Sequence, residues 1–548
     1  MAQFRKNVLS QYLRTKCDKQ LRLSLYSPPE LQAMDWPVPL EARPAVQILR
    51  DRGKEWEQAK MQDLETAFGN HLIGVKENGK FKRIELAAVL AVNPPSPTVI
   101  VQARFSHPDL RQTFLTSIGL TPQRIEQIPA FGAFEPDIVL VKTPADGEVE
   151  ILPTGDTTPI PPGTQRKALL VSDIKHAGEA NSSYSSEVAL YAVLLANWLR
   201  LNELESNFFV ADRLGLWTRA KETSALAELV TRNPGASISD RLQAFIGDLE
   251  KVDFQIFFQT VSHFFSQDLP RVLAITDWAA LDWHVDSRCS TCDFLGHRNW
   301  LRASDRGTLD ANRSHYCVTA AEDSGHLSRL STITRGGRKT LHHAGHINVT
   351  AVSTVTTADP VFDLHNALKA DRNHLPHRAT ALLTGAVSVA DNTTTIDFPR
   401  YADLQIFVSV NFDPGTGLLC ALGSEARFRQ RVPFGQTSTV QRTWNAEAQT
   451  LLASTAEEER SVVMSFLSRL ADVFDFVHNT AADGGRSGQT LSTSVLVVRL
   501  EIRRSLQVLV GTENVPRGYR GVSIKLVNRR LHSLLRNSGR TAQDQRTV

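Results

Sequence analysis

The stretch Ala168-Leu-Leu-Val-Ser-Asp-Ile-Lys175 decides how the first half of this chain is expected to fold. Its aliphatic run is typical of a β-strand, and it ends with an acid and a base two positions apart. Residues i and i+2 of a strand project to the same side of a sheet. The sequence therefore predicts a strand that carries Asp173 and Lys175 on one face.

The sequence around this strand mixes strand-like and helical patterns. Residues 97–103 form another strand-like run, and residues 186–199 show an apolar helical pattern, so the class is expected to be α/β. Residues 144–163 are rich in Pro, Gly, Thr and Asp, which predicts a long hairpin or loop between two strands. Three regions are expected: an α/β domain over 1–325, a helical basic connector over 326–390 and a second α/β domain over 391–548. The basic segment 332–339 of the connector is either a solvated helical surface or a surface that binds the DNA backbone.

Length and composition describe an ordinary globular protein. A chain of 548 residues is long enough for about two to four domains. The balance of 61 basic and 58 acidic residues is too even to indicate nucleic-acid binding by itself. No segment approaches the roughly 18 apolar residues that span a bilayer. The first residues lack the apolar region of a secretory signal, so we expect a cytoplasmic protein without a membrane partner.

A second acid precedes another strand-like run. Asp137 stands in Phe134-Glu-Pro-Asp-Ile-Val-Leu-Val141, where it opens the apolar segment. Phosphodiester hydrolysis commonly uses hard cations, and carboxylates supply their oxygen ligands. On this hypothesis Asp137 and Asp173 hold Mg²⁺ or Mn²⁺, while Lys175 orients the attacking water or stabilises developing negative charge. The alternative is that each acid simply ends a strand, which is the commoner role of an isolated aspartate.

Glu187 and Tyr191 follow at positions i and i+4, so they share one face of the next helix. The order of Asp137, the Asp-Ile-Lys strand and then Glu187 with Tyr191 resembles the motifs of RecB-like PD-(D/E)XK nucleases, in which the helix motif usually begins with Gln. The resemblance implies a restriction-endonuclease-like core, a mixed sheet flanked by helices, that hydrolyses DNA. It also implies that the backbone carbonyl of Ile174 joins the metal ligands.

The segment Arg52–Leu64 resembles the first helix of the same family, which often carries a metal-binding histidine. Trp56 occupies that place here, and Glu57 follows it. Glu57 is either a substitute oxygen ligand or a charged position on an amphipathic helix.

Five cysteines in so long a chain do not form a disulfide framework. Cys289 and Cys292 form a Cys-x2-Cys pair, Cys317 follows, and Cys17 would complete a set of four if the ends of the domain meet. Spacing alone leaves zinc, an iron-sulfur cluster and unliganded thiols open. Cys420 lies in a β-like apolar run and is more simply a core thiol.

The nuclease resemblance, which covers roughly residues 10–345, extends to the cysteines. A subgroup related to AddB and to CRISPR-associated RecB-like nucleases places one cysteine before the nuclease motifs and three after them. The resemblance implies that a 4Fe-4S cluster ties the ends of the domain together, in a structural role. Its ligands would be Cys17, Cys289, Cys292 and Cys317.

The last region begins with two β-prone runs around a Pro-Gly-Thr-Gly turn, which predicts a hairpin. In bacterial proteins that join this nuclease to an RNase H-like domain, the corresponding first strand carries an Asp-x-Glu pair. Here the run reads Ser409-Val-Asn411, and Asp403 and Asp413 fall outside the expected register. We therefore expect an RNase H-like α/β domain that is catalytically degenerate and binds a partner or DNA.

Together these features predict a Mg²⁺- or Mn²⁺-dependent DNA nuclease that acts on single strands as an exonuclease or flap-type enzyme. Repair, recombination and defence against foreign DNA all fit this activity. The chain has no Walker-type motif, so a helicase or other motor would act in trans. The chief alternative is a non-catalytic pseudo-nuclease that serves as a DNA-binding or scaffolding subunit of a helicase-nuclease or defence complex. A third alternative is a zinc-stabilised interaction protein.

Overall fold

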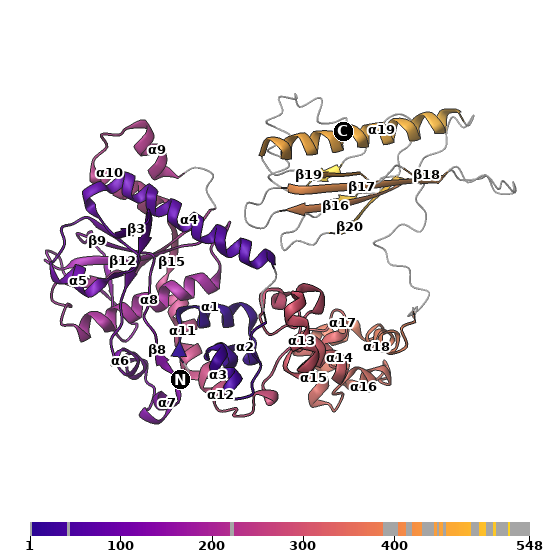
Figure 1. Cartoon of the computed structure of the whole chain (residues 1–548), viewed down its shortest axis with the longest axis horizontal. Helices are drawn as coiled ribbons and strands as arrows, with labels where there is room; N and C mark the ends of the chain where they lie inside the picture. Colours follow the sequence, from indigo (N-terminus) through magenta and orange to yellow (C-terminus); the bar gives the residue numbers. More distant parts are fainter. Residues whose placement is uncertain are drawn as a thin grey trace. The chain divides into compact units, whose positions relative to one another are not determined.

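The chain divides into two compact units, residues 1–390 and 391–548 (Figure 1). In the first unit, the computed structural model describes residues 3–40, 44–219 and 224–386. In the second unit it describes residues 404–412, 419–429, 443–445, 449–452, 456–483, 493–499, 508–510 and 524–526.

A mixed sheet forms the centre of the first unit, in the strand order β15-β14-β12-β9-β6-β2, with β13 also paired to β12. The central strands β6, β9 and β12 alternate in direction, whereas β14 runs parallel to β12. The predicted α/β class, a mixed sheet flanked by helices, is confirmed. The strands are Leu72–Ile73 (β2), Thr98–Val101 (β6), Ile138–Lys142 (β9), Lys167–Ile174 (β12), Phe208–Val210 (β13), Arg213–Trp217 (β14) and Glu250–Asp253 (β15).

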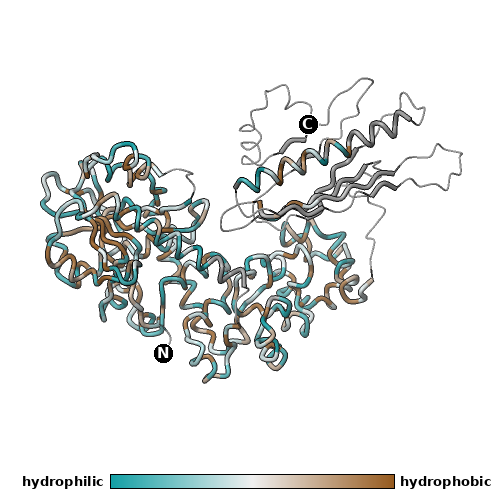
Figure 2. Tube along the Cα trace, turned by 45° about the horizontal axis from the view of Figure 1, so that its top comes forward, coloured by the Kyte–Doolittle hydropathy of each residue, from teal (hydrophilic) through white to brown (hydrophobic). Residues whose placement is uncertain are grey.

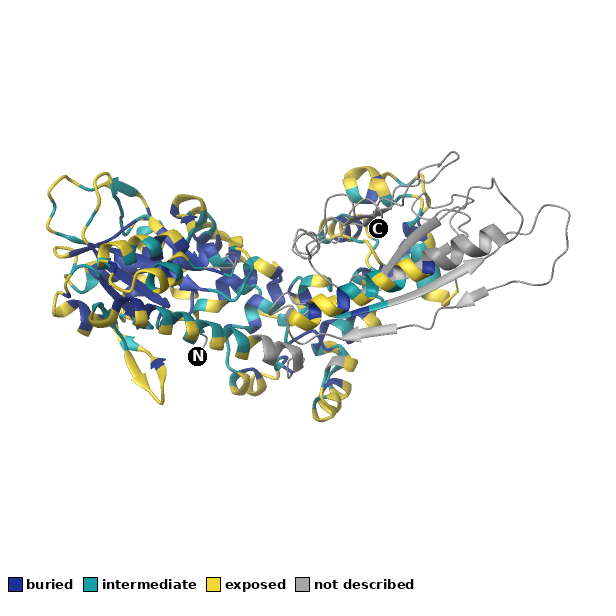
Figure 3. Ribbon diagram, turned by 90° about the horizontal axis from the view of Figure 1, so that it is seen from above, coloured by how far each residue is buried: buried dark blue, intermediate teal, exposed yellow. Residues whose placement is uncertain are grey.

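Helices cover both faces of this sheet, and its central strands are therefore apolar on both sides (Figures 2 and 3). Val139 and Val141 of β9 pack in the cluster that contains α8, whereas Ile138 and Leu140 pack in the cluster that contains α4. The covering helices include Lys6–Thr15 (α1), Pro44–Phe68 (α4), Leu110–Ser117 (α6), Ser182–Leu201 (α8), Ala225–Arg232 (α9), Ile238–Asp248 (α10) and Phe254–His263 (α11).

Helix α8 is buried along most of its length, because it lies against the sheet and also contacts α1, α6 and α11. Its first turn is fixed by Asn181, whose side-chain oxygen accepts hydrogen bonds from the backbone N–H groups of Ser183 and Tyr184. The cap sets where α8 begins and therefore which of its side chains face the end of β12.

The N-terminal segment packs against residues that follow the sheet. Arg271 of α12 makes a bidentate ion pair with Asp18 of α2, with its shortest N–O distance at 2.5 Å. The two-residue strand β1 also pairs with β8. These elements are Gln3–Phe4 (β1), Asp18–Leu23 (α2), Pro28–Ala33 (α3), Ala130–Phe131 (β8) and Leu269–Leu273 (α12).

Short helices with their own apolar cluster follow, and the basic stretch 332–339 lies among them. Arg335 binds Asp286 at 3.1 Å, and Arg338 and Lys339 both pair with Asp282. These internal ion pairs favour a structural role over DNA-backbone binding for the three cations. The helices are Ala303–Ala311 (α13), Cys317–Ser324 (α14), Arg335–His343 (α15), Val349–Ser353 (α16), Asn366–Asp371 (α17) and Leu375–Thr384 (α18).

Small hairpins and short helices complete the first unit. Residues 144–163 contain the antiparallel hairpin of β10 and β11, as the composition of that segment predicts. These elements are Val75–Glu77 (β3), Lys80–Lys82 (β4), Ile84–Glu85 (β5), Leu86–Ala91 (α5), Ala103–Arg104 (β7), Pro122–Gln127 (α7), Val149–Ile151 (β10) and Thr157–Pro159 (β11).

The described part of the second unit is a sheet in the order β18-β17-β16-β20, with β19 paired to β17 and α19 in contact with β17. The predicted antiparallel pair is confirmed as β16 and β17, with Ser409 opposite Gly423 and Asn411 opposite Ala421. Asp403, Asp413 and residues 527–548 lie outside the described residues. The elements are Leu404–Phe412 (β16), Leu419–Arg429 (β17), Thr443–Asn445 (β18), Gln449–Leu452 (β19), Ala456–Asp483 (α19), Thr493–Arg499 (β20), Val508–Val510 (β21) and Ile524–Leu526 (β22).

None of the described helices in either unit combines the length and the apolar character needed to traverse a bilayer.

Candidate functional site

Two buried aspartates meet where β9 begins and β12 ends. The strands are antiparallel with Ile138 opposite Ser172, so Asp137 comes next to Asp173. The backbone N–H of Ile174 donates to Asp137 Oδ2 at 2.8 Å, and the N–H of Asp137 lies 3.4 Å from Asp173 Oδ1. Both carboxylates are almost fully buried. The sheet itself therefore holds the pair together.

Lys175 joins this pair from the residue after β12. Its N–H donates to the carbonyl of Trp217, and its ammonium group lies 2.5 Å from Asp173 Oδ2 and 3.6 Å from Glu187 Oε2. The hydroxyl of Tyr191 donates to Glu187 Oε1 at 3.0 Å, one turn further along α8. The structure thus brings together the residues that the sequence singles out on the two strands and the helix.

The pKa values of the two aspartates are shifted in opposite directions. Burial raises the pKa of Asp137, the neighbouring charge of Asp173 adds to this, and the result is well above the ordinary value. Burial also opposes ionisation of Asp173, but the ammonium group of Lys175 outweighs it and lowers that pKa to about 2. Asp173 is therefore neutralised by Lys175, while Asp137 is the carboxyl group that a further cation would stabilise most.

The pKa of Lys175 is raised well above its ordinary value. Burial alone would lower this pKa, but attraction to Asp173, Glu187 and Asp137 dominates. The ammonium group is consequently charged over the whole physiological pH range. Such a group can stabilise negative charge that develops beside it.

Glu57 of α4 also lies at this site. It is joined to Asp137 by Gln102, a residue that the sequence analysis did not single out. The side-chain amide of Gln102 donates to Glu57 Oε1 at 2.6 Å and lies 3.5 Å from Asp137 Oδ1. Its backbone N–H also donates to the Asp137 carbonyl at 2.8 Å. Gln102 has a φ of 55°, which is a left-handed conformation. Residues other than glycine rarely adopt it, and those that do are frequent at functional sites. Only the end of the aliphatic run at this glutamine could have indicated it.

Trp56, at the position where the family often has a metal-binding histidine, is half-buried one residue before Glu57. Its ring centroid lies 5.9 Å from that of His176, and the ammonium group of Lys60 lies 4.8 Å from the Trp56 centroid. An indole cannot ligate a hard cation, so Trp56 forms part of an aromatic and basic wall next to the carboxylates.

The chemistry of these donors fits a divalent cation, although a cation would have to compete with existing contacts. Within the described ranges, no group of three or more His, Cys, Asp or Glu side chains is arranged to hold a metal ion as it stands. Asp173 is occupied by Lys175, and Glu57 by Gln102. Asp137 is buried beside another carboxylate and carries a raised pKa, and a hard cation would offset this unfavourable charge.

The four predicted cysteine ligands lie in one neighbourhood. Cys17 precedes α2, Cys289 and Cys292 lie in or next to the turn Ser287–Thr291, and Cys317 begins α14. Burial raises the pKa of each thiol, that of Cys17 to about 12, and within each of the six pairs a negative charge on one thiolate raises the pKa of the other. None of the four forms a disulfide. In the described part of the chain these thiols are not arranged as a ready metal group, and a bound metal centre would make them easier to deprotonate.

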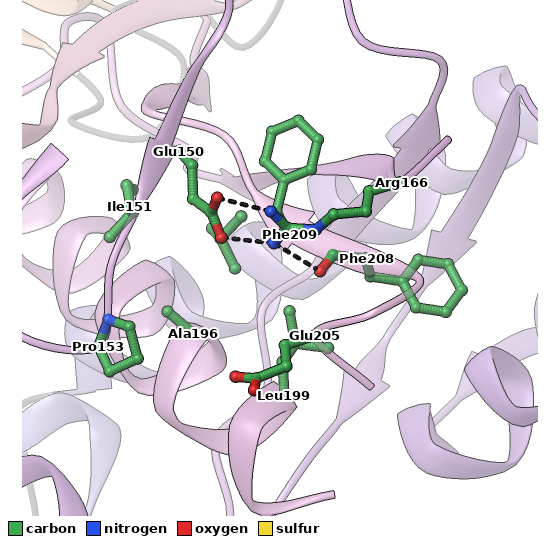
Figure 4. Close-up of a pocket in the computed structure, with 10 residues that line it drawn as sticks. Glu150, Ile151, Pro153, Arg166, Ala196, Leu199, Glu205, Phe208 and Phe209 are labelled. Carbon is green, nitrogen blue, oxygen red and sulfur yellow. Dashed lines mark hydrogen bonds and ion pairs between the residues drawn. The ribbon is translucent and has the colours of Figure 1, made fainter. Parts of the chain in front are cut away.

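A separate small pocket lies between α8 and the strands β10 and β13 (Figure 4). Its volume of about 20 Å³ has room for little more than one water molecule. Arg166 spans its wall and makes a bidentate ion pair with Glu150. This pocket is too small to bind a nucleotide or a comparable substrate, and its Arg166 and Glu150 are already paired with each other.

Comparisons with family models, with curated proteins and with solved structures found no match to this chain.

Proposed function

We propose that this chain is a metal-dependent DNA nuclease of the RecB-like PD-(D/E)XK type. The observation that carries the proposal is the buried group of Asp137, Asp173 and Lys175 on two antiparallel strands, with Glu187 in contact with the lysine. Carboxylates beside an ammonium group are suited to hydrolysis of a phosphodiester, in which a cation and a fixed positive charge offset the charge of the phosphate.

Asp137 and Asp173 would hold Mg²⁺ or Mn²⁺, with Glu57 and the carbonyl of Ile174 as further oxygen donors. The bound ion would lower the pKa of a water molecule and offset charge on the phosphate. Lys175 remains protonated and stabilises negative charge at the phosphate oxygens. Glu187, held by Tyr191, keeps the ammonium group directed toward Asp173. Each side chain thus has a role for which its contacts suit it.

We also propose that Cys17, Cys289, Cys292 and Cys317 hold a 4Fe-4S cluster. Nearby cations support this: burial raises the pKa of Cys317 and of Cys17, but the charge of Lys19 opposes the rise at Cys317 and that of Arg335 opposes it at Cys17. Four thiolates in one buried site carry negative charge that nearby cations such as these offset. Zinc has the same ligand requirement, so iron and zinc content must be measured directly.

A cleavage assay on the full chain, purified without oxygen, tests the proposal. Single-stranded and duplex DNA labelled at either end would be incubated with Mn²⁺, Mg²⁺ or EDTA. We expect cleavage of the single strand with Mn²⁺, and a loss of at least about 100-fold in Asp173→Asn and Lys175→Ala. Lys142→Gln is the matched control, since Lys142 is another buried lysine of this sheet and pairs with Glu148 at 2.6 Å.

The catalytic role of Lys175 is contradicted if Lys175→Ala cuts DNA as fast as the wild type. Lys142→Gln should also cut at the wild-type rate in that experiment. Substrate preference follows from the same gels. Faster cutting of RNA than of DNA would replace the proposed substrate, and cleavage of duplex only would exclude single-strand action.

The second candidate is a pseudo-nuclease that binds DNA or scaffolds a complex. Two observations favour it: no ready three-ligand metal group exists among the described residues, and Trp56 replaces the expected histidine. It predicts DNA binding without metal-dependent cleavage, and no binding of Mn²⁺ that depends on Asp137. Calorimetric titration of Mn²⁺ into wild type and Asp137→Asn separates the two candidates.

Further aspects of the proposal concern the cellular setting. A cytoplasmic nuclease without a motor of its own would work with a helicase that supplies single strands, in repair, recombination or defence. The second unit would be a degenerate RNase H-like domain, because Ser409 and Asn411 of β16 are not anionic metal ligands. Its contribution would be to bind the partner or the DNA.

A further inference from the structure

Helix α1 presents a polar stripe that the proposed chemistry does not use. Lys6, Ser10 and Arg14 are spaced by four residues, so they follow one face of the helix, where Ser10 is buried between the two cations. Val8 and Leu9 are buried, and α1 packs against α8, the helix that carries Glu187. The packing fixes α1 beside the carboxylate group.

The first residue of α1 places a second ammonium group at the candidate site. Lys6 Nζ donates to the carbonyl of Glu135, two residues before Asp137, at 3.4 Å. Burial would lower the pKa of Lys6, but the charges of Asp137, Asp173 and Glu187 attract its proton and the pKa is raised. A carbonyl uses only one of the three N–H donors of an ammonium group. The remaining donors can bind an anion.

The other end of the stripe meets the candidate catalytic lysine through an aromatic ring. The guanidinium carbon of Arg14 lies 5.9 Å from the ring centroid of Tyr184, and the ammonium nitrogen of Lys175 lies 5.3 Å from the same centroid. Arg14 is exposed and Tyr184 is half-buried in the first turn of α8. A cation and an aromatic ring are thus available to a ligand at this end.

Cations beside an aromatic ring that is partly accessible, as Arg14 is beside the half-buried Tyr184, are typical of surfaces that bind single-stranded nucleic acid. Lys6 and Arg14 are eight positions apart, so they are separated by about 12 Å along the helix axis. At roughly 3.4 Å per nucleotide in a stacked strand, this distance corresponds to three or four nucleotides. The two cations are far enough apart to bind different phosphates of one strand.

We propose that Lys6, Arg14 and Tyr184 form the binding surface for the single strand next to the scissile phosphate, with phosphates on the two cations and a base on the aromatic ring. This inference rests on the proposed nuclease function and adds substrate-binding residues to it. A structural role is the alternative, in which Lys6 only offsets the buried carboxylates and Arg14 only covers Tyr184. That role predicts altered stability without altered DNA binding.

Fluorescence anisotropy with a labelled 20-nucleotide oligo-dT tests the surface in the full chain. An Asp173→Asn background is used so that binding is measured without cleavage. We expect Lys6→Ala and Arg14→Ala each to weaken binding about tenfold and to reduce the slope of log Kd against log salt by about one. Tyr184→Ala should weaken binding by at least about fivefold, with Tyr184→Phe close to wild type.

Matched variants exclude a general effect of charge or folding. Arg232→Ala removes an exposed arginine of α9 that pairs with Glu228 on the same helix, and it should leave both Kd and salt slope unchanged. Lys6→Arg should retain the salt slope. Melting curves recorded for every variant identify those that are destabilised.

The outcomes distinguish this surface from the nuclease proposal. Unchanged Kd and salt slope in Lys6→Ala and Arg14→Ala overturn the surface, even if the wild type cuts DNA with Mn²⁺. Absence of oligo-dT binding by the wild type overturns it as well. Binding that depends on both cations, in a protein that never cuts, supports the surface and removes the nuclease assignment.

Discussion

The backbone N–H of Ile174 donates a 2.8 Å hydrogen bond to the carboxylate of Asp137, so the main chain of one strand holds the side chain of its neighbour. Asp137 is thereby kept beside Asp173 by the sheet rather than by a loop. A carboxylate that is placed in this way is preorganised, but it is also forced to lie near a second negative charge.

Asp137→Asn should stabilise the protein while it abolishes cleavage. The amide oxygen can still accept from Ile174, but the charge that is repelled by Asp173 is gone. We expect the free energy of unfolding in EDTA at pH 7 to rise by about 1 kcal/mol, which urea titration measures. A destabilised Asp137→Asn protein would show that the two carboxylates are not in conflict. Asp146→Asn, in the loop after β9, serves as the control.

Tyr191→Phe removes one buried hydroxyl and leaves the ring. Its loss frees Glu187 Oε1 and should lower the free energy of unfolding by about 1 kcal/mol. Cleavage with Mn²⁺ should fall about tenfold, since Glu187 no longer has a fixed position against Lys175. The reading of Glu187 as a positioning residue is wrong if Tyr191→Phe cuts at the wild-type rate at every Mn²⁺ concentration.

Cys17→Ser should release the N-terminal segment from the segments that follow the sheet. We expect loss of bound iron or zinc, measured by elemental analysis, and a melting temperature at least about 5 °C lower. Cys420→Ser, the fifth cysteine, is the comparison and should keep the full metal content. Equal metal content in the two variants would exclude Cys17 as a ligand.

The contribution of His326 to the stability of the first unit should decrease as the pH falls from about 6.5 to 4. Burial, followed by the charge of Arg338, lowers the pKa of His326 to about 4, and its ring stacks on Trp283 at 4.2 Å. In the unfolded chain this histidine takes up its proton near pH 6.5, so the unfolded state binds more protons in that window and is favoured.

His326→Gln should make this loss of stability smaller, because the glutamine cannot be protonated. Melting temperatures at pH 7, 5.5 and 4.5 measure the difference, with the exposed His343→Gln as the control. A pH profile of His326→Gln that coincides with the wild-type profile would contradict the assignment.

The sequence predicted the parts of the fold that repeat with a period. Alternation and apolar runs identified β9 and β12, and a helical pattern identified α8, because burial constrains these residues most strongly. The same alternation placed Asp173 and Lys175 on one face, and the structure joins their side chains. The antiparallel order of β9 and β12, which brings Asp137 to them, could not be derived from either strand alone.

Residues that reach the site from elsewhere were not predictable. Gln102 depends on a left-handed backbone, and the sequence marks it only by the end of an aliphatic run. Lys6 depends on how α1 packs against α8, which leaves no local pattern in the sequence. The internal ion pairs of Arg335 and Arg338 were also hidden, since a basic stretch is read equally well as a solvated surface or a DNA contact.

The guanidinium group of Arg335 donates to the carbonyls of Thr15 and Lys16, 320 and 319 positions earlier in the chain. During synthesis this contact cannot form until the arginine has been made, which at about 5 to 20 residues per second is some 15 to 60 seconds after the first helix. Helix α1 can already pack against α8 in that interval, but its last turn lacks the Arg335 contact until 335 of the 548 residues have been made. This contact can therefore form while the second unit is still to be synthesised.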